Sequence, residues 1–311
     1  MVTVRGVPSN ANSPRRRRSA AEVVPAVKKI AVLPALLTLG NGICGFVAIT
    51  YASKIGMLTP GDPDPAHADE FNFVWAGWFI LFAMLFDMLD GYVARLSRTA
   101  SAFGGELDSL CDAISFGVAP AFLVLKLGPG WQPSAFLHQL LAGIAALYLA
   151  CTVLRLARFN VDNTPDPLGH KRFRGLPSPG AAGCIASLAI LRGDFANKLV
   201  LDWGAELEPA RLVTTRLVEI ASPIGALLVA LLMVSNVPYP HVTGKVFAGK
   251  KHIGHLIQLL LAVFIIYMVR ELAPVLIFWV YAVAFPVRAA FVRSLRRGPA
   301  APPDLHEPTP R

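Results

Sequence analysis

Residues 72–96 read NFVWAGWFILFAMLFDMLDGYVARL, and residues 72–86 within this stretch carry no charged side chain. A helix crosses the hydrocarbon core of a bilayer with about 20 mostly apolar residues. Because that core offers no water to the backbone, each peptide group has to be paired within the chain, which favours a helix. The stretch therefore predicts a membrane-spanning helix that carries two acidic residues, Asp87 and Asp90, near its end.

Apolar runs of this kind recur along the chain. Of its 311 residues, 54% are hydrophobic and only 16% are charged, whereas an ordinary soluble domain has about 25% charged residues. We therefore predict an all-α fold, a polytopic membrane helical bundle of about eight transmembrane helices. The expected spans are 30–53, 72–96, 105–127, 135–158, 178–194, 212–235, 252–270 and 272–294, of which the fifth is the shortest.

The two ends of the chain differ from this pattern. Residues 1–25 are basic and lack the apolar stretch of a secretory signal, so we expect a disordered basic cytoplasmic tail. Residues 298–311 are rich in proline and charge, and we expect a disordered C-terminal tail. Residues 26–297 are then a single membrane domain.

Basic residues follow alternate spans, which indicates the orientation of the chain. Cytoplasmic loops are enriched in Lys and Arg, so both termini are expected to face the cytoplasm. The expected location is the inner (cytoplasmic) membrane of the cell. The net charge of +9 is clustered at span ends, which favours anionic membrane lipids as partners and argues against nucleic acid. The residues concerned are Arg95, Arg98, Arg155, Arg158, Lys171, Arg172, Arg174, Lys245, Lys250, Lys251, Arg293, Arg296 and Arg297.

Four aspartates lie at the facing ends of the second and third spans. Asp87 and Asp90 are spaced i, i+3, and Asp108 and Asp112 are spaced i, i+4, so each pair shares a helical face. An ionised carboxylate near a bilayer costs several kcal/mol unless it is paired or bound to metal. If the two spans run antiparallel, the four carboxylates converge.

Converging carboxylates of this kind suit hard divalent cations such as Mg²⁺ or Mn²⁺. Two such ions about 4 Å apart clamp a pyrophosphate and stabilise the attacking and leaving oxygens of a displacement. Gly91 and Gly104 leave room for a nucleotide, and Arg95 supplies a cation for phosphate. Two alternatives remain at this point: interhelical ion pairs with nearby arginines, and a metal or solute transporter whose acids coordinate the cargo.

The combined pattern D-x-x-D-G-x-x-A-R-x8-G-x-x-x-D-x-x-x-D, from Asp87 to Asp112, resembles the signature of the CDP-alcohol phosphotransferase family. The resemblance implies a six-helix core within residues 26–297, a cytoplasm-facing polar cavity, two divalent cations and a homodimer. It also implies that all four aspartates bind metal and that Asp112 is the catalytic base. Positions that the resemblance assigns to CDP-lipid binding are Gly91, Arg95, Ser101 and Gly104.

The family's Pro-Asn-x-x-Thr element has a partial counterpart at Pro34 to Thr38. Ala35 occupies the place of the asparagine, while Thr38 matches. We therefore expect Thr38 to contribute to CDP-lipid binding, with Asn41 further along the same helix as a second polar candidate.

Wider segments resemble bacterial and archaeal phosphatidylserine synthases, among them residues 37–46, 106–120, 155–160 and 173–179. The resemblance implies CDP-diacylglycerol and L-serine as substrates. Arginine binds carboxylate in a bidentate fork, so we expect the acceptor at Arg155, Arg158, Asn160, Arg174 and Ser178. The open alternatives are glycerol 3-phosphate or another alcohol as acceptor, and an archaeal-type ether lipid as donor.

Overall fold

The computed structural model describes residues 32–57, 65–97, 101–129, 134–162, 175–195, 208–237, 239 and 272–296. Within these ranges all regular structure is helical, and five helices are long and apolar enough to cross a membrane. The chain is thus a polytopic helical membrane protein, which confirms the predicted fold class. The two tails, residues 1–25 and 298–311, and the seventh expected span, residues 252–270, lie outside the described ranges.

The other seven expected spans coincide with helices of the structure. The third span is one continuous rod of α3, the π-helix η1 and α4, and the fifth is α6 continued by the π-helix η2. The elements are α1 (Val32–Lys54), α2 (Pro65–Ser97), α3 (Ala102–Asp112), η1 (Ala113–Val118), α4 (Ala119–Leu127), α5 (Ala135–Asp162), α6 (Ser178–Ile190), η2 (Leu191–Phe195), α8 (Glu208–Val234) and α11 (Ala273–Arg296).

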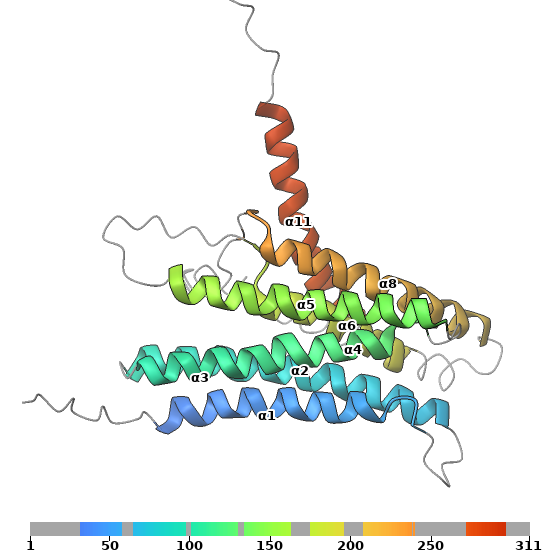
Figure 1. Cartoon of the computed structure of the whole chain (residues 1–311), viewed down its shortest axis with the longest axis horizontal. Coiled ribbons are helices and arrows are strands. Elements are labelled where there is room, and N and C mark those ends of the chain that lie inside the picture. Colours follow the sequence, from blue (N-terminus) through green and yellow to red (C-terminus); the bar gives the residue numbers. More distant parts are fainter. Residues whose placement is uncertain are drawn as a thin grey trace, which may run out of the picture.

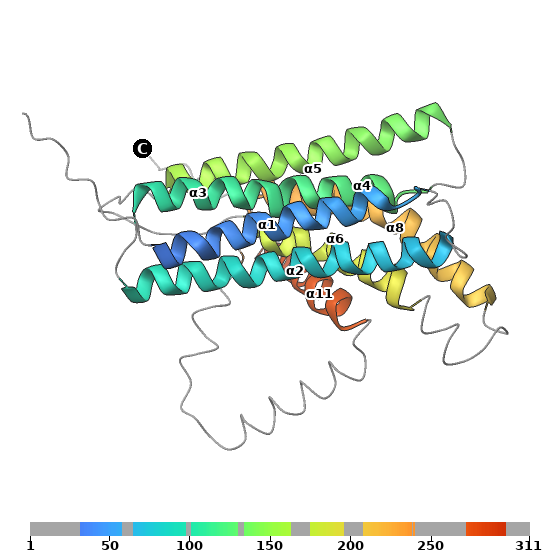
Figure 2. The same cartoon turned by 90° about the horizontal axis from the view of Figure 1, so that it is seen from below.

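Apart from α11, the long helices run with their axes roughly aligned, and α6 lies among them (Figures 1 and 2). Residues 181–190 of α6 are all buried, and this helix packs against α2, α8 and α11. Its small side chains allow the close approach typical of membrane bundles. A Cβ on Gly77 of α2, for example, would lie 2.8 Å from the Ala186 carbonyl oxygen.

Helix α11 crosses the bundle at a steep angle (Figure 1). Its aromatic side chains fill spaces over glycines: Phe278 covers Gly183 of α6, and Trp279 covers Gly225 of α8. The Trp279 indole also donates to the Cys184 carbonyl oxygen at 3.2 Å. These contacts dock α11 on the central helix at a defined position.

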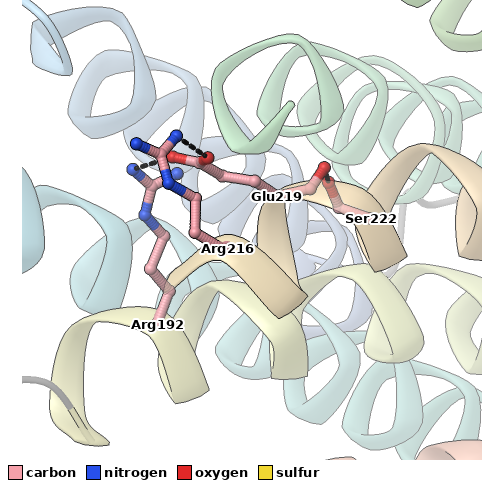
Figure 3. A network of polar contacts seen from close by, with 4 residues as sticks. All are labelled: Arg192, Arg216, Glu219 and Ser222. Atoms are coloured by element: carbon pink, nitrogen blue, oxygen red, sulfur yellow. Dashed lines mark hydrogen bonds and ion pairs between the residues drawn. The ribbon is translucent and has the colours of Figure 1, made fainter. Parts of the chain in front are cut away.

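A charged network joins η2 to α8 at one end of the bundle (Figure 3). Arg192 of η2 and Arg216 of α8 both contact the Glu219 carboxylate, at 3.4 and 3.1 Å. The Arg192 guanidinium also lies 4.3 Å from the centre of the Phe73 ring, near the start of α2. Since Phe73 and Asp87 are separated by about 21 Å along a straight helix, this network lies far from the aspartates.

Candidate active site

Three of the four aspartates form one cluster. Asp87 and Asp90 near the end of α2, and Asp108 in α3, each place one carboxylate oxygen within 4.8 Å of the others. Asp90 Oδ2 and Asp108 Oδ1 are buried and have no hydrogen-bond partner within the described part of the chain. Unpaired buried carboxylate oxygens are costly, so the cluster has the composition and the unsatisfied oxygens of a site for a hard cation.

Asp112 lies one turn beyond Asp108 and is buried. Its Oδ1 accepts a hydrogen bond of 2.9 Å from the Asn41 side-chain amide of α1. Asp112 also interacts electrostatically with Asp87 and Asp108. The structure therefore brings all four aspartates into one region, with Asp112 at the side where α1 packs.

The packing of α1 against the rod of α3 and η1 sets the position of Asp112. The Ser115 hydroxyl donates to the Asn41 carbonyl oxygen at 2.8 Å, and Gly45 of α1 leaves the space that Ser115 fills. The π-helix η1 begins directly after Asp112, and the Tyr148 hydroxyl of α5 donates to its Phe116 carbonyl oxygen at 3.1 Å. Such wider helical turns often occur at functional sites.

Local chemistry also fixes the start of α3. Ser101 is its N-cap, and the side-chain oxygen accepts a hydrogen bond of 3.0 Å from the Gly104 N–H. This is the standard means of pairing the first free N–H groups of a helix. Ser101 and Gly104, both predicted to bind the CDP-lipid, are thus joined to each other at the helix start.

The remaining predicted CDP-lipid residues also lie near the cluster. The Arg95 guanidinium folds back over Gly91, where a Cβ would lie 3.6 Å from its Nη1. Thr38 is buried next to the Asp90 carboxylate, and its hydroxyl donates to the Pro34 carbonyl oxygen at 3.0 Å. Thr38 therefore contacts the acidic cluster through Asp90.

The predicted acceptor residues separate into an inner and an outer group. Arg155 donates from Nη1 to the Ser178 hydroxyl at 2.8 Å and interacts electrostatically with Asp112. Its Nε is buried and has no hydrogen-bond partner in the ranges that the structure describes. Arg158 and Asn160 are exposed, although the Asn160 amide donates to the Ser109 hydroxyl beside Asp108 at 2.9 Å. Arg174 lies outside the described residues.

The backbone preceding α6 places Ser178 opposite Arg155. Gly175 has a φ of +90°, and its N–H donates to the Val237 carbonyl oxygen at 2.9 Å. A Cβ at this position would collide with the Met233 carbonyl oxygen, so both the backbone conformation and the close approach require glycine. The chain is thereby tied to the end of α8 just before α6 begins.

Sequence reasoning missed several residues around this site. Ser109, Ser115 and Tyr281 are ordinary members of apolar helices in the sequence, and nothing in their spacing links them to the aspartates. Tyr281 of α11 interacts electrostatically with Arg155, although 126 positions separate the two residues in the numbering. Only the packing of the helices reveals these neighbours.

Comparison with known proteins identifies the family. Residues 31–217 match the family described as CDP-alcohol phosphatidyltransferase. A CDP-diacylglycerol–serine O-phosphatidyltransferase of Helicobacter pylori is 30% identical over 222 residues, covering 69% of this chain and 74% of the relative. One of Mycobacterium tuberculosis is 28% identical over 288 residues, covering 90% and 84%. An archaetidylserine synthase of Methanothermobacter thermautotrophicus is 35% identical over 167 residues, covering 53% and 58%. The chain therefore belongs to the CDP-alcohol phosphatidyltransferase family.

Proposed function

We propose that this membrane enzyme is a phosphatidylserine synthase, which transfers the phosphatidyl group from CDP-diacylglycerol to the hydroxyl of L-serine and releases CMP. Relatives from bacteria, an archaeon and a yeast carry the name CDP-diacylglycerol–serine O-phosphatidyltransferase. The observation that carries the proposal is that Arg155 interacts electrostatically with Asp112. Its guanidinium is half-buried, and its Nε has no hydrogen-bond partner among the described residues. A guanidinium is suited to the carboxylate of an amino-acid acceptor.

Asp87, Asp90, Asp108 and Asp112 are the proposed ligands of two divalent cations, Mg²⁺ or Mn²⁺. The residues fit such ions, because the donor set is made of carboxylate oxygens and two of these oxygens are buried without partners. When bound, the cations offset the negative charge of the pyrophosphate and of the departing CMP. Asp87, Asp90 and Asp108 supply the converging oxygens, and Asp112 completes the set from the next turn of α3.

Asp112 is also the proposed base. Asn41 holds its Oδ1, which leaves Oδ2 to accept the proton of the serine hydroxyl. The serine oxygen then forms a bond to the phosphorus that bears diacylglycerol, and the bond between that phosphorus and the CMP oxygen breaks. The leaving oxygen takes the electron pair and CMP departs, while the proton remains on Asp112.

The CDP-lipid is proposed to lie against Thr38, Asn41, Gly91, Arg95, Ser101 and Gly104. Gly91 and Gly104 let the pyrophosphate approach the backbone, and Arg95, whose guanidinium already lies over Gly91, contacts its oxygens. For the acceptor, Arg155 and Ser178 form the inner contact, and Arg158 and Asn160 lie at the more exposed edge. Arg174, which lies outside the described residues, is proposed to bind the acceptor as well.

The proposed location is the inner (cytoplasmic) membrane, with the active site facing the cytoplasm. Support comes from Arg95, Arg155 and Arg158, which lie at the same end of the bundle as the aspartates, because basic residues favour the cytoplasmic side. Anionic lipids and a second copy of the chain, in a homodimer, are the proposed partners.

The acceptor assay tests this function. Purified protein with CDP-diacylglycerol and Mg²⁺ or Mn²⁺ is expected to release CMP with L-serine, and to stop when EDTA removes the metal. Release with sn-glycerol 3-phosphate or inositol but not with L-serine would overturn the serine assignment while keeping the reaction class. Metal flux into vesicles without CMP release under any acceptor would instead support a transporter.

A further inference from the structure

Helix α11 lies beyond residues 31–217, the part of the chain that matches the family, yet it packs on the central helix of the bundle. The Tyr239 hydroxyl donates to the Ala282 carbonyl oxygen of α11 at 2.9 Å, in addition to the contacts of Phe278 and Trp279 described above. The side chain of Tyr281 therefore projects from a firmly docked segment.

The Tyr281 ring lies beside the inner acceptor residues. A Cβ on Gly180 of α6 would be 3.4 Å from its Cε1, an ordinary packing distance. Gly180 follows Ser178 by two positions, and Ser178 accepts the hydrogen bond from Arg155. The start of α6 therefore contacts both residues: Ser178 binds Arg155 of α5, and Gly180 packs against Tyr281 of α11.

Neighbouring rings hold the Tyr281 ring in place. Its centroid lies 5.7 Å from that of Tyr239 and 5.5 Å from that of Phe285. The residue is half-buried, and its hydroxyl makes no hydrogen bond to any of the described residues. A rigid ring with an unused hydroxyl next to a polar site is well placed to bind a ligand atom.

Arg155 is a charged neighbour of Tyr281, and the two residues interact electrostatically. A guanidinium has only N–H donors, whereas a tyrosine hydroxyl can donate as well as accept. The O–H is then available to an acceptor atom that Arg155 also attracts, and a carboxylate satisfies both groups.

We propose that Tyr281 is a specificity-determining residue, whose hydroxyl donates a hydrogen bond to the carboxylate of the acceptor amino acid beside Arg155. This inference rests on the proposed serine acceptor. It gives α11, an element outside the matched part of the family, a direct part in substrate choice.

Tyr281→Phe tests the proposal, because it keeps the ring and removes only the hydroxyl. The KM for L-serine is expected to rise roughly 3- to 10-fold, the value of one hydrogen bond. The KM for CDP-diacylglycerol and kcat at saturating serine stay near the wild-type values, as expected when uniform binding is lost. Tyr51→Phe is the matched control, since Tyr51 lies in an aromatic cluster with Phe71 and Trp75 near the other end of the bundle.

A second acceptor separates recognition of the carboxylate from a change in packing. Serinol, which has a hydroxymethyl group in place of the carboxylate, is used at high concentration and should react equally with wild-type and Tyr281→Phe protein. An unchanged KM for serine, or equal losses with serine and serinol, would overturn the role of Tyr281. Failure of the wild-type protein to use serine would instead refute the proposed function itself.

Discussion

At the scale of single residues, Asn41 holds the side chain of Asp112, the proposed catalytic base. Its amide donates to Asp112 Oδ1, and its backbone carbonyl accepts from Ser115. Asn41→Leu removes the hydrogen bond to Asp112, so we expect kcat to fall about 10-fold or more, and the KM for CDP-diacylglycerol to rise because the proposed contact of Asn41 with the lipid is lost as well. Asp112→Asn should abolish turnover while nucleotide binding is kept. CMP release under saturating and limiting substrate measures turnover by both variants, and equilibrium binding of CDP-diacylglycerol measures the nucleotide binding kept by Asp112→Asn.

The control for Asn41→Leu is Thr50→Val on the same helix, which removes an exposed hydroxyl that bonds only to the Phe46 carbonyl oxygen. We expect it to be neutral. If Asn41→Leu raises the KM for CDP-diacylglycerol and leaves kcat intact, Asn41 contacts the nucleotide and does not position Asp112.

The sequence predicts the grouping of the aspartates better than the contacts of their neighbours. Spacing predicts that Asp87 shares a helical face with Asp90, and Asp108 with Asp112, because helical geometry is local. The carboxylates of Asp87, Asp90 and Asp108 do lie together in the structure. The hydrogen bond between Asn41 and Asp112 joins residues 71 positions apart, so it depends on how α1 packs against α3. The metal and substrate roles of all these residues stay predictions.

At the scale of elements, the ion pair between Arg192 of η2 and Glu219 of α8 fixes two helices far from the active site (Figure 3). The Glu219 side chain is only 8% exposed. Glu219→Gln removes the main countercharge of the Arg192 guanidinium, which also interacts with Asp69 and Glu70, and we expect a loss of about 3 kcal/mol of stability. Thermal unfolding in detergent reports the change, and kcat of the remaining folded protein should stay the same.

Arg216→Gln provides the comparison within the same network. Its side chain is 49% exposed, so the pair that it forms with Glu219 is screened by solvent and worth about 0–1 kcal/mol. If Glu219→Gln and Arg216→Gln lower the stability equally, burial of the pair between Arg192 and Glu219 does not increase its contribution to stability.

Elements also differ in what their sequences reveal. Long apolar runs predict α1, α2, α5 and α8 because hydrophobic length is a property of the segment itself. The steep crossing of α11 depends instead on where glycine leaves space, as at Gly183 for the Phe278 ring. The π-helices η1 and η2 likewise interrupt apolar runs without a signal in the residue pattern.

At the scale of the whole molecule, the bundle has two ends of different character. One end holds the aspartates with Arg95, Arg155 and Arg158, and the other holds residues 55–57 after α1 and the start of α2. In the proposed reaction, the charged headgroup and CMP reach the aspartates from water. If serine is supplied by the cytoplasm, the end with the aspartates has to face the cytoplasm. The arginines at that end support this direction.

Single cysteines test the orientation without any assumption about catalysis. The four native cysteines, Cys44, Cys111, Cys151 and Cys184, are buried, so the wild-type protein should react little with a membrane-impermeant maleimide and serves as the background. Leu96 and Met57 are 71% and 66% exposed and lie at opposite ends of the α1–α2 hairpin. We expect Leu96→Cys to react only in inverted membrane vesicles and Met57→Cys only in intact spheroplasts. The reverse pattern would place the aspartates on the outer side and refute a cytoplasmic active site.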